Sequence, residues 1–196
     1  IIKVLESGKN AISEKPVTLS SQDLDVMIKT AEETGKLFTV HQNRRWDNDY
    51  RTIKNILDKN ELGKVHSIDS RVYGSRGIPG DWRQEKKHGG GMVLDWGVHL
   101  LDQMLMLNDG KKIESVYATL TNITNEEVDD GFRAVIRFKD GPECLVEVFT
   151  NNFIEAPRWY MCGENGTAII SDWDMNGEIV KIQDWEKLDA VPIQAG

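Results

Sequence analysis

The sequence predicts two parts of different fold class, an incomplete α/β unit over residues 1–45 and an α+β domain over residues 46–196. Three observations support this division. Residues 10–41 read as strand, helix and strand, which is the order of a βαβ unit. From residue 113 onward, short strand patterns follow one another through turn signals. Between these two parts lies one very apolar helix pattern, at residues 92–107.

The first part contains too little structure to bury itself. Its predicted elements are a helix end at residues 1–9 stopped by Gly8, a strand at 10–13, a helix at 23–31 capped by Ser20 or Ser21 and ended by Gly35, and a strand at 37–41. A βαβ unit implies a parallel sheet, and parallel sheets need more than two strands. The first 45 residues therefore require further structure around them.

The second part has the pattern of an open, mainly antiparallel sheet. Its predicted elements are a helix at about 47–60, a strand at 64–74, a polar glycine-rich loop at 74–91, the helix at 92–107, and strands at about 113–124, 131–139, 143–153, 157–162, 167–173 and 178–184. Apolar and polar residues alternate from Phe132 to Phe138. Strands joined by short turns, such as those at residues 139–142 and 163–166, pair antiparallel.

Composition and charge exclude several classes of function. The chain has 24 basic and 32 acidic residues, a net charge of −8, which disfavours binding to nucleic acid or to an anionic membrane. We find no run of 18 apolar residues and no secretory signal. Two cysteines, Cys144 and Cys162, cannot form a disulfide framework. We therefore expect a cytoplasmic protein.

The helix at 92–107 carries the strongest chemical signal. Apolar residues surround it, which predicts a buried helix, yet Asp95, His99 and Asp102 follow the spacing i, i+4 and i+7 and should share one face. Two carboxylates beside an imidazole should raise its pKa and fix its orientation. Gly97 disfavours a helix interior, so it predicts close approach of a backbone or a ligand.

The glycines before this helix, Gly89, Gly90 and Gly91, should leave free N–H groups at its positive end. They form a poor phosphate-binding fingerprint, because the third glycine is missing and a loop rather than a strand precedes them. A purely structural histidine is an alternative for His99. A metal site of Asp95, His99 and Asp102, with His41 or His88, is less well supported, since three residues along one helix rarely turn toward one ion. We therefore predict no metal.

Two other segments suggest ligand contacts. Glu14, Lys15 and Pro16 follow the strand at 10–13, and open α/β sheets bind ligands beyond the carboxyl ends of their strands. An exposed turn lysine is the alternative for Lys15. The segments Asn43-Arg44-Arg45-Trp46 and Asp81-Trp82-Arg83 suit a hydroxylated or anionic substrate. Arginine beside tryptophan is also an ordinary surface stacking pair.

Taken in order, these segments resemble the glucose–fructose oxidoreductase, inositol dehydrogenase and MocA-type oxidoreductases, the Gfo/Idh/MocA family. The resemblance lies in residues 8–13 before Glu14-Lys15-Pro16, in Asn43–Trp46, in the three glycines followed by Asp95, His99 and Asp102, and in residues 163–167 (Gly-Glu-Asn-Gly-Thr). These segments extend over nearly the whole chain. The resemblance identifies residues 1–45 as the end of a Rossmann domain and the helix at 92–107 as the catalytic helix.

The resemblance implies an NAD(P)-dependent dehydrogenase that oxidises a secondary alcohol of a sugar, inositol or related polyol. His99 would be the general acid and base, Asp95 would orient His99 and bind a substrate hydroxyl, and Lys15 would bind the substrate hydroxyl and the nicotinamide ribose. The implied cofactor contacts are Glu14, Lys15, Pro16 and Arg44, and the implied substrate contacts are Asn43, Trp82, Arg83, Asp95 and His99. Asp102 would lie behind them. The open sheet face would form a homodimer or homotetramer.

The chain departs from this family at its start. The family's cofactor domain begins with a strand and Gly-x-Gly-x-x-Gly, and neither occurs here, so we expect about 80–90 residues to precede this segment in the intact enzyme. We also expect the second domain to be truncated at its C-terminus, after residues 191–196. The substrate and the choice between NAD and NADP are not readable. The alternatives are a non-catalytic sugar or cofactor sensor, an oligomerisation module, and hydrolysis or epimerisation with transient use of NAD.

Overall fold

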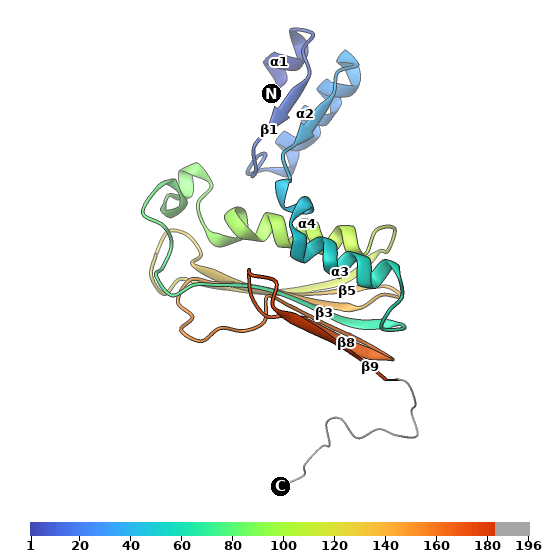
Figure 1. Cartoon of the computed structure of the whole chain (residues 1–196). Helices are drawn as coiled ribbons and strands as arrows, with labels where there is room; N and C mark the ends of the chain where they lie inside the picture. Colours follow the sequence, from blue (N-terminus) through green and yellow to red (C-terminus); the bar gives the residue numbers. More distant parts are fainter. Residues whose placement is uncertain (183–196) are drawn as a thin grey trace.

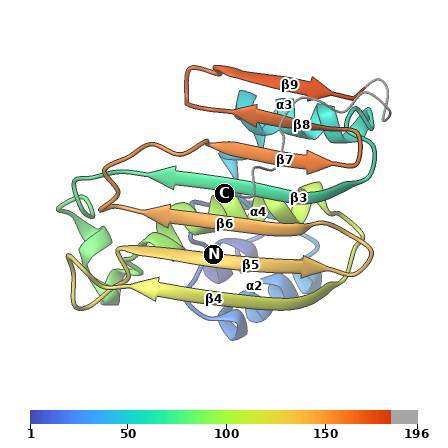
Figure 2. The same cartoon turned by 90° about the horizontal axis from the view of Figure 1, so that it is seen from below.

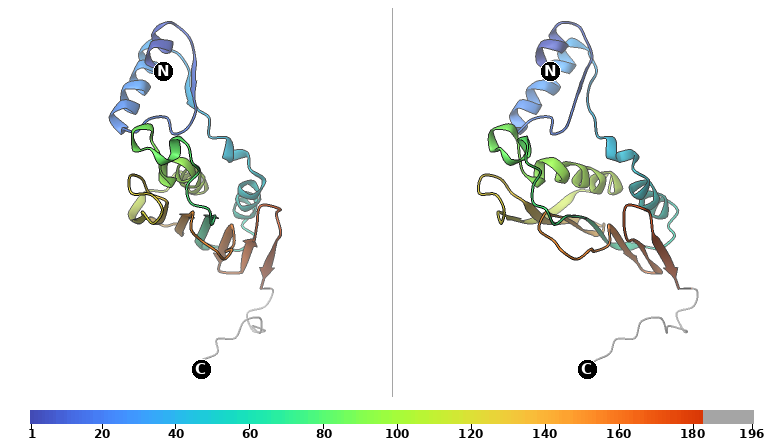
Figure 3. Two further views of the ribbon diagram at one scale, coloured as in Figure 1. Left: turned by 90° about the vertical axis from the view of Figure 1, so that its left-hand side faces the viewer. Right: turned by 60° about the vertical axis from the view of Figure 1, so that its left-hand side comes forward.

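A small α/β unit stands above a layer of helices, which in turn covers one face of a large sheet (Figure 1). The structure, a computed structural model, describes residues 1–182. Side views show the same three levels and place the α/β unit next to the helices rather than next to the sheet (Figure 3). No helix in the described range is long and apolar enough to cross a membrane.

The α/β unit has the predicted order of elements. It consists of α1 (Ile2–Glu6), β1 (Ala11–Ser13), α2 (Ser21–Thr34) and β2 (Phe38–Val40), and β1 pairs with β2 in parallel. The Ser20 side chain caps α2 by accepting a hydrogen bond from the backbone N–H of Asp23, and Gly35 ends the helix with a φ of 61°. Ile12 and Leu37 remain exposed, as expected for a two-stranded parallel sheet.

The second part is built on a seven-stranded mixed sheet. Its strands are β3 (Val65–Tyr73), β4 (Ile113–Thr121), β5 (Gly131–Phe138), β6 (Glu143–Phe149), β7 (Trp159–Gly163), β8 (Gly166–Ile170) and β9 (Gly177–Lys181). Their order is β4-β5-β6-β3-β7-β8-β9. The central pair, β3 and β6, is parallel and the other five pairs are antiparallel. The predicted fold class is thus confirmed; the expected residues 183–184 of the last strand and the tail at 191–196 lie outside the described range.

Within residues 1–182 the helices all lie on one face of this sheet, and Figure 2 looks onto the opposite face, along which the strands are in view. They are α3 (Asn48–Asp58), a π-helical turn (Val93–Gly97) and α4 (Val98–Leu107), with 3-10 turns at Asn43–Trp46, Trp82–Gln84 and Lys86–His88. Alternation along β5 divides the faces, because Phe132, Ala134, Ile136 and Phe138 are buried under the helices. Arg133, the next residue in the alternation, lies on the open face.

The apolar helix pattern at 92–107 gives a different structure from the one predicted. It begins as the π-helical turn, and the helix is not buried all round, because Leu105 and Met106 are exposed. Gly97 is also explained differently. A Cβ atom on Gly97 would lie 2.9 Å from the ring of Phe132 on β5, so the close neighbour is an aromatic side chain rather than a backbone or a ligand.

Candidate active site

The side chain of Lys15 reaches from the end of β1 to the start of the helix at 93–107. Its Nζ donates to the backbone carbonyl of Asp95 at 2.9 Å and to Asp95 Oδ1 at 2.7 Å. Lys15 is largely buried, so the alternative of an exposed turn lysine is wrong. This contact joins the α/β unit to the catalytic helix that the resemblance indicates.

Asp95 has a second cationic partner in the glycine-rich loop. Arg83 Nε donates to Asp95 Oδ2 at 2.7 Å, and the residue Asp95 is only 6% exposed. Burial alone would raise the pKa of Asp95, but the hydrogen bonds from Lys15 and Arg83 hold that pKa below its ordinary value. Asp95 therefore stays ionised and fixes the position of Lys15.

His99 is buried next to this ion pair, at 5% exposure, and its pKa is shifted opposite to the prediction. Burial, Lys15 and Arg44 lower the pKa of His99 to about 4 and outweigh Asp95 and Asp102, which favour the charged form. The expected orientation by Asp95 is also absent, since within residues 1–182 His99 Nδ1 has no hydrogen-bond partner. The imidazole is thus neutral at pH 7 and can accept a proton.

The low pKa of His99 makes stability depend on pH. Between its ordinary pKa near 6.5 and about 4 the unfolded chain binds a proton that the folded chain does not, so the free energy of unfolding decreases as pH falls through this window. We expect His99→Gln to lack this contribution, which is on the order of 2–3 kcal/mol. Urea unfolding of both proteins from pH 7.5 to 4 measures it, and parallel curves would contradict the assigned pKa.

The three glycines of the loop serve packing rather than anion binding. Contrary to the prediction, their N–H groups are not free: Gly89, Gly90 and Gly91 donate to backbone carbonyls of residues 86, 85 and 83. The backbone N–H groups of Met92 and Val93, which follow the glycines, donate to the carbonyl and the carboxylate of Asp129. A Cβ atom on Gly90 would lie 2.4 Å from the carbonyl oxygen of Arg83, so this loop needs glycine.

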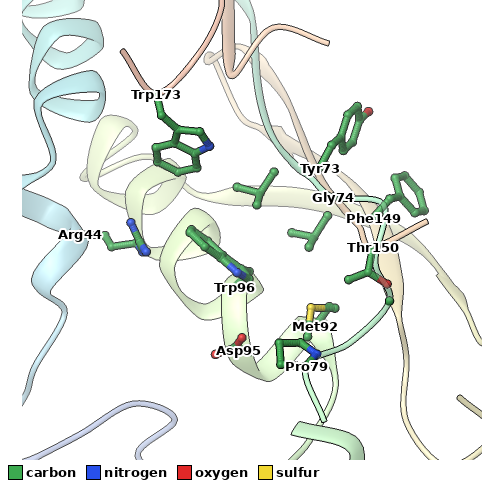
Figure 4. A pocket seen from close by; sticks show the side chains of 13 residues that line it. Arg44, Tyr73, Gly74, Pro79, Met92, Asp95, Trp96, Phe149, Thr150 and Trp173 are labelled. Carbon is green, nitrogen blue, oxygen red and sulfur yellow. The ribbon is translucent and has the colours of Figure 1, made fainter. Parts of the chain in front are cut away.

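A cavity of about 400 Å³ lies beside Asp95, between the start of the helix and the ends of the sheet strands (Figure 4). Arg44, Asp95, Trp96 and Trp173 line it together with aliphatic and aromatic side chains of β3 and β6. The guanidinium of Arg44 lies 4.0 Å from the ring centroid of Trp96, and Arg44 Nη1 pairs with Asp47 at 2.9 Å. The cavity volume is in the range of small-molecule sites.

The other predicted residues lie around this centre. Asn43 is exposed, and Trp82 stacks on Arg83 at 4.8 Å. Of the predicted site residues, Arg44 and Asp95 line the cavity, whereas its lining does not include Lys15, Asn43, Trp82, Arg83 or His99. Glu14 pairs with His41 at 2.9 Å on the surface, and the peptide bond between Lys15 and Pro16 is cis. Asp102 accepts two hydrogen bonds from Arg45. No group of three or more His, Cys, Asp or Glu side chains in residues 1–182 is arranged to hold a metal ion.

Sequence reasoning missed three residues of this region. Trp96 reads as a core residue of an apolar helix, and Trp173 follows β8 in a turn without any motif. Gln103 is fully buried and donates from Nε2 to the backbone carbonyl of Arg44 at 2.7 Å, which fixes Arg44 against α4. Gln103 could have been noticed in the sequence, because it is a polar residue on the apolar side of a helix.

Comparisons with known proteins agree with this arrangement. The pattern of the GFO/IDH/MocA C-terminal domain matches residues 50–169, and that of the oxidoreductase family's NAD-binding Rossmann fold matches residues 1–42. The crystal structure of an NAD-binding protein from Listeria innocua has 53% sequence identity and a TM-score of 0.89, covering 92% of this chain and 53% of that protein.

Two further relatives have more specific descriptions. The scyllo-inositol 2-dehydrogenase (NADP(+)) IolW of Bacillus subtilis is 32% identical over 53% of this chain and 29% of its own length. The WlbA dehydrogenase of Bordetella pertussis, in complex with NADH and UDP-GlcNAcA, is 26% identical, with a TM-score of 0.75, over 93% of this chain and 55% of that protein. The chain thus spans about half or less of these relatives. It belongs to the GFO/IDH/MocA family of oxidoreductases.

Proposed function

We propose that the protein transfers a hydride between a secondary alcohol of a sugar, inositol or related polyol and NAD or NADP. One observation carries the proposal: Lys15, held by the ionised Asp95, lies in one buried site with a neutral His99 whose Nδ1 is unpaired within residues 1–182. The relatives support the substrate class, since one is a scyllo-inositol dehydrogenase and another binds NADH with a nucleotide sugar.

The residues then have distinct roles. The neutral imidazole of His99 accepts the hydroxyl proton while the hydrogen on the same carbon leaves as hydride, so the alcohol becomes a ketone. Lys15 donates a hydrogen bond to that hydroxyl, and Asp95 holds Lys15 in place. Arg44 and Arg83 lie at the edges of the site and contact the remaining hydroxyls. A bound nicotinamide supplies the hydride acceptor.

The fit of the cofactor is partial. Glu14, Lys15 and Pro16 lie at the carboxyl end of β1, the side on which dinucleotides bind to parallel sheets, and they would contact the nicotinamide half. His99 Nδ1, which has no hydrogen-bond partner in the described part of the chain, is compatible with a ligand at this point. This chain contains no Gly-x-Gly-x-x-Gly that could bind the pyrophosphate.

We therefore expect the 196-residue chain by itself to bind NAD(H) and NADP(H) weakly or not at all. Phosphate contacts at a helix N-terminus anchor dinucleotides in this type of fold, and the residues present contribute only to the other half. Calorimetric titration of both cofactors against the chain tests this expectation. Micromolar binding would show that the chain carries a complete cofactor site.

The proposed activity is tested by incubating the whole protein with NAD+ or NADP+ and a panel of inositols, hexoses and 1,5-anhydro sugars. We expect an increase in absorbance of the reduced nicotinamide with at least one uncharged polyol. Binding of the polyol and the cofactor without reduction of NAD+ or NADP+ would instead favour a non-catalytic sensor. Product formation without net reduction would favour transient use of the cofactor.

We also propose that the open face of the sheet pairs two copies of the protein. Tyr117, Tyr160 and Val180 on that face are exposed, and the helices in the described part of the chain cover the opposite face. Light scattering after size-exclusion chromatography should give a dimer or tetramer, and Tyr117→Lys should dissociate it. A monomeric wild type would contradict this proposal. The cytoplasmic location stays a prediction.

A further inference from the structure

The cavity beside Asp95 has an aromatic wall that no motif of the sequence indicates. The rings of Trp96 and Trp173 lie with centroids 5.7 Å apart and both line the cavity (Figure 4). Trp96 comes from the helix that carries Asp95, whereas Trp173 comes from the turn between β8 and β9. Trp173 is 52% exposed, a large apolar surface for a residue that lines a site.

Two cations and a rigid turn fix the position of Trp173. The guanidinium groups of Arg158 and Arg44 lie 4.9 and 5.8 Å from its ring centroid. Arg158 is itself only 3% exposed and is anchored by Ser70 and Asp49. In the turn, Asp172 accepts hydrogen bonds from the backbone N–H groups of residues 174 and 176. The indole is therefore held in place before any ligand binds, which lowers the entropic cost of binding.

The charges that line this cavity are neutralised within the protein. Among residues 1–182, Arg44 and Asp95 are its charged lining residues. Arg44 pairs with Asp47, and Asp95 pairs with both Lys15 and Arg83. An anionic ligand would find no unpaired cation here, while an uncharged ring with apolar C–H faces would find two indoles.

We propose that Trp173 is a specificity-determining residue that, with Trp96, packs against the C–H face of an uncharged cyclic polyol and so positions it toward Asp95. This inference rests on the proposed function for its substrate class. It adds a residue from the sheet domain to the site formed by Lys15, Asp95 and His99. An aromatic wall without an unpaired cation should favour uncharged rings over sugar acids and nucleotide sugars.

The test compares three variants of the whole protein by steady-state kinetics on uncharged cyclic polyols. Trp173→Ala should raise KM about tenfold with kcat within about twofold of the wild type, because stacking contributes to binding rather than to proton transfer. Trp173→Phe should restore KM to within about threefold. The control is Trp46→Ala, because Trp46 is exposed and, together with Arg44 and Trp173, lines a neighbouring cavity but not the one beside Asp95. An unchanged KM in this variant would locate the effect of Trp173 in the cavity beside Asp95.

Two results would overturn the inference: an unchanged KM in Trp173→Ala, or a higher kcat/KM of the wild type for uronic acids or nucleotide sugars than for uncharged rings. If no substrate is oxidised, the proposed function fails, and binding of the same polyols to the 196-residue chain is then measured by ligand-observed NMR. Binding weakened by Trp173→Ala and not by Trp46→Ala would support the assignment independently of turnover. Absence of binding by all uncharged rings would refute it.

Discussion

Replacing His99 by alanine should lower kcat for polyol oxidation by about a thousandfold. General acid–base catalysis contributes roughly 10²–10⁴ to the rate, and the neutral imidazole of His99 is the proposed proton acceptor of the site. The change should leave KM nearly unaltered, because the proposed substrate contacts of Lys15 and of the aromatic wall remain. Steady-state kinetics of the whole protein with its best polyol measure both quantities.

Two controls separate catalysis from folding in this experiment. His66→Ala removes an exposed histidine of β3 and should keep full activity. Added imidazole should restore part of the activity of His99→Ala, because the substitution leaves a cavity of about the size of the lost ring. Near-normal kcat in His99→Ala would refute the role of His99 as the base. Loss of activity in the His66 variant as well would point to unfolding.

Replacing Asp95 by alanine should destabilise the protein by about 3 kcal/mol and lower kcat by about a hundredfold. Asp95 is buried, and its removal leaves Lys15 and Arg83 without their common partner. Breaking a buried ion pair costs roughly 3–5 kcal/mol, and a displaced positioning group costs about 10² in rate. Urea unfolding and steady-state kinetics test the two effects separately.

Asp81 supplies the matched comparison for Asp95. Both carboxylates bind Arg83, with Asp81 Oδ2 2.6 Å from Arg83 Nη1, but the side chain of Asp81 is 43% exposed. Asp81→Ala should therefore cost less than 1 kcal/mol, as exposed pairs do. Equal losses of stability in Asp81→Ala and Asp95→Ala would mean that the hydrogen bond from Lys15 to Asp95 has no special importance.

Local signals predicted the elements of the fold well. The cap at Ser20, the helix end at Gly35 and the alternation from Phe132 to Phe138 depend on neighbours in the chain, and the structure confirms them. The mixed order of the sheet was not readable, because the parallel pairing of β3 with β6 is a tertiary choice that no local pattern encodes.

The site was predictable in its parts but not in its electrostatics. Spacing along one helix suggested that two carboxylates control His99, whereas burial and the distant cations Lys15 and Arg44 decide its pKa. Lys15 is 80 positions away from Asp95, so its charge could not be weighed from local sequence. Trp173 was missed for the same reason, since only the fold brings the turn after β8 to the cavity.

The parallel pairing of β3 and β6 also determines when this sheet can form. Arg71 of β3 donates a hydrogen bond to Glu147 of β6, which lies 76 positions later in the chain. The other neighbour of β3, strand β7, comes later still. During synthesis, β3 leaves the ribosome long before either partner exists. The β4-β5-β6 meander can fold locally, whereas the central strand must wait for a long loop to close. The helix bearing His99 packs against Phe132 of this meander, so it can find its partner strand before β3 is paired. Completion of the sheet is therefore governed by the late-synthesised strands β6 and β7.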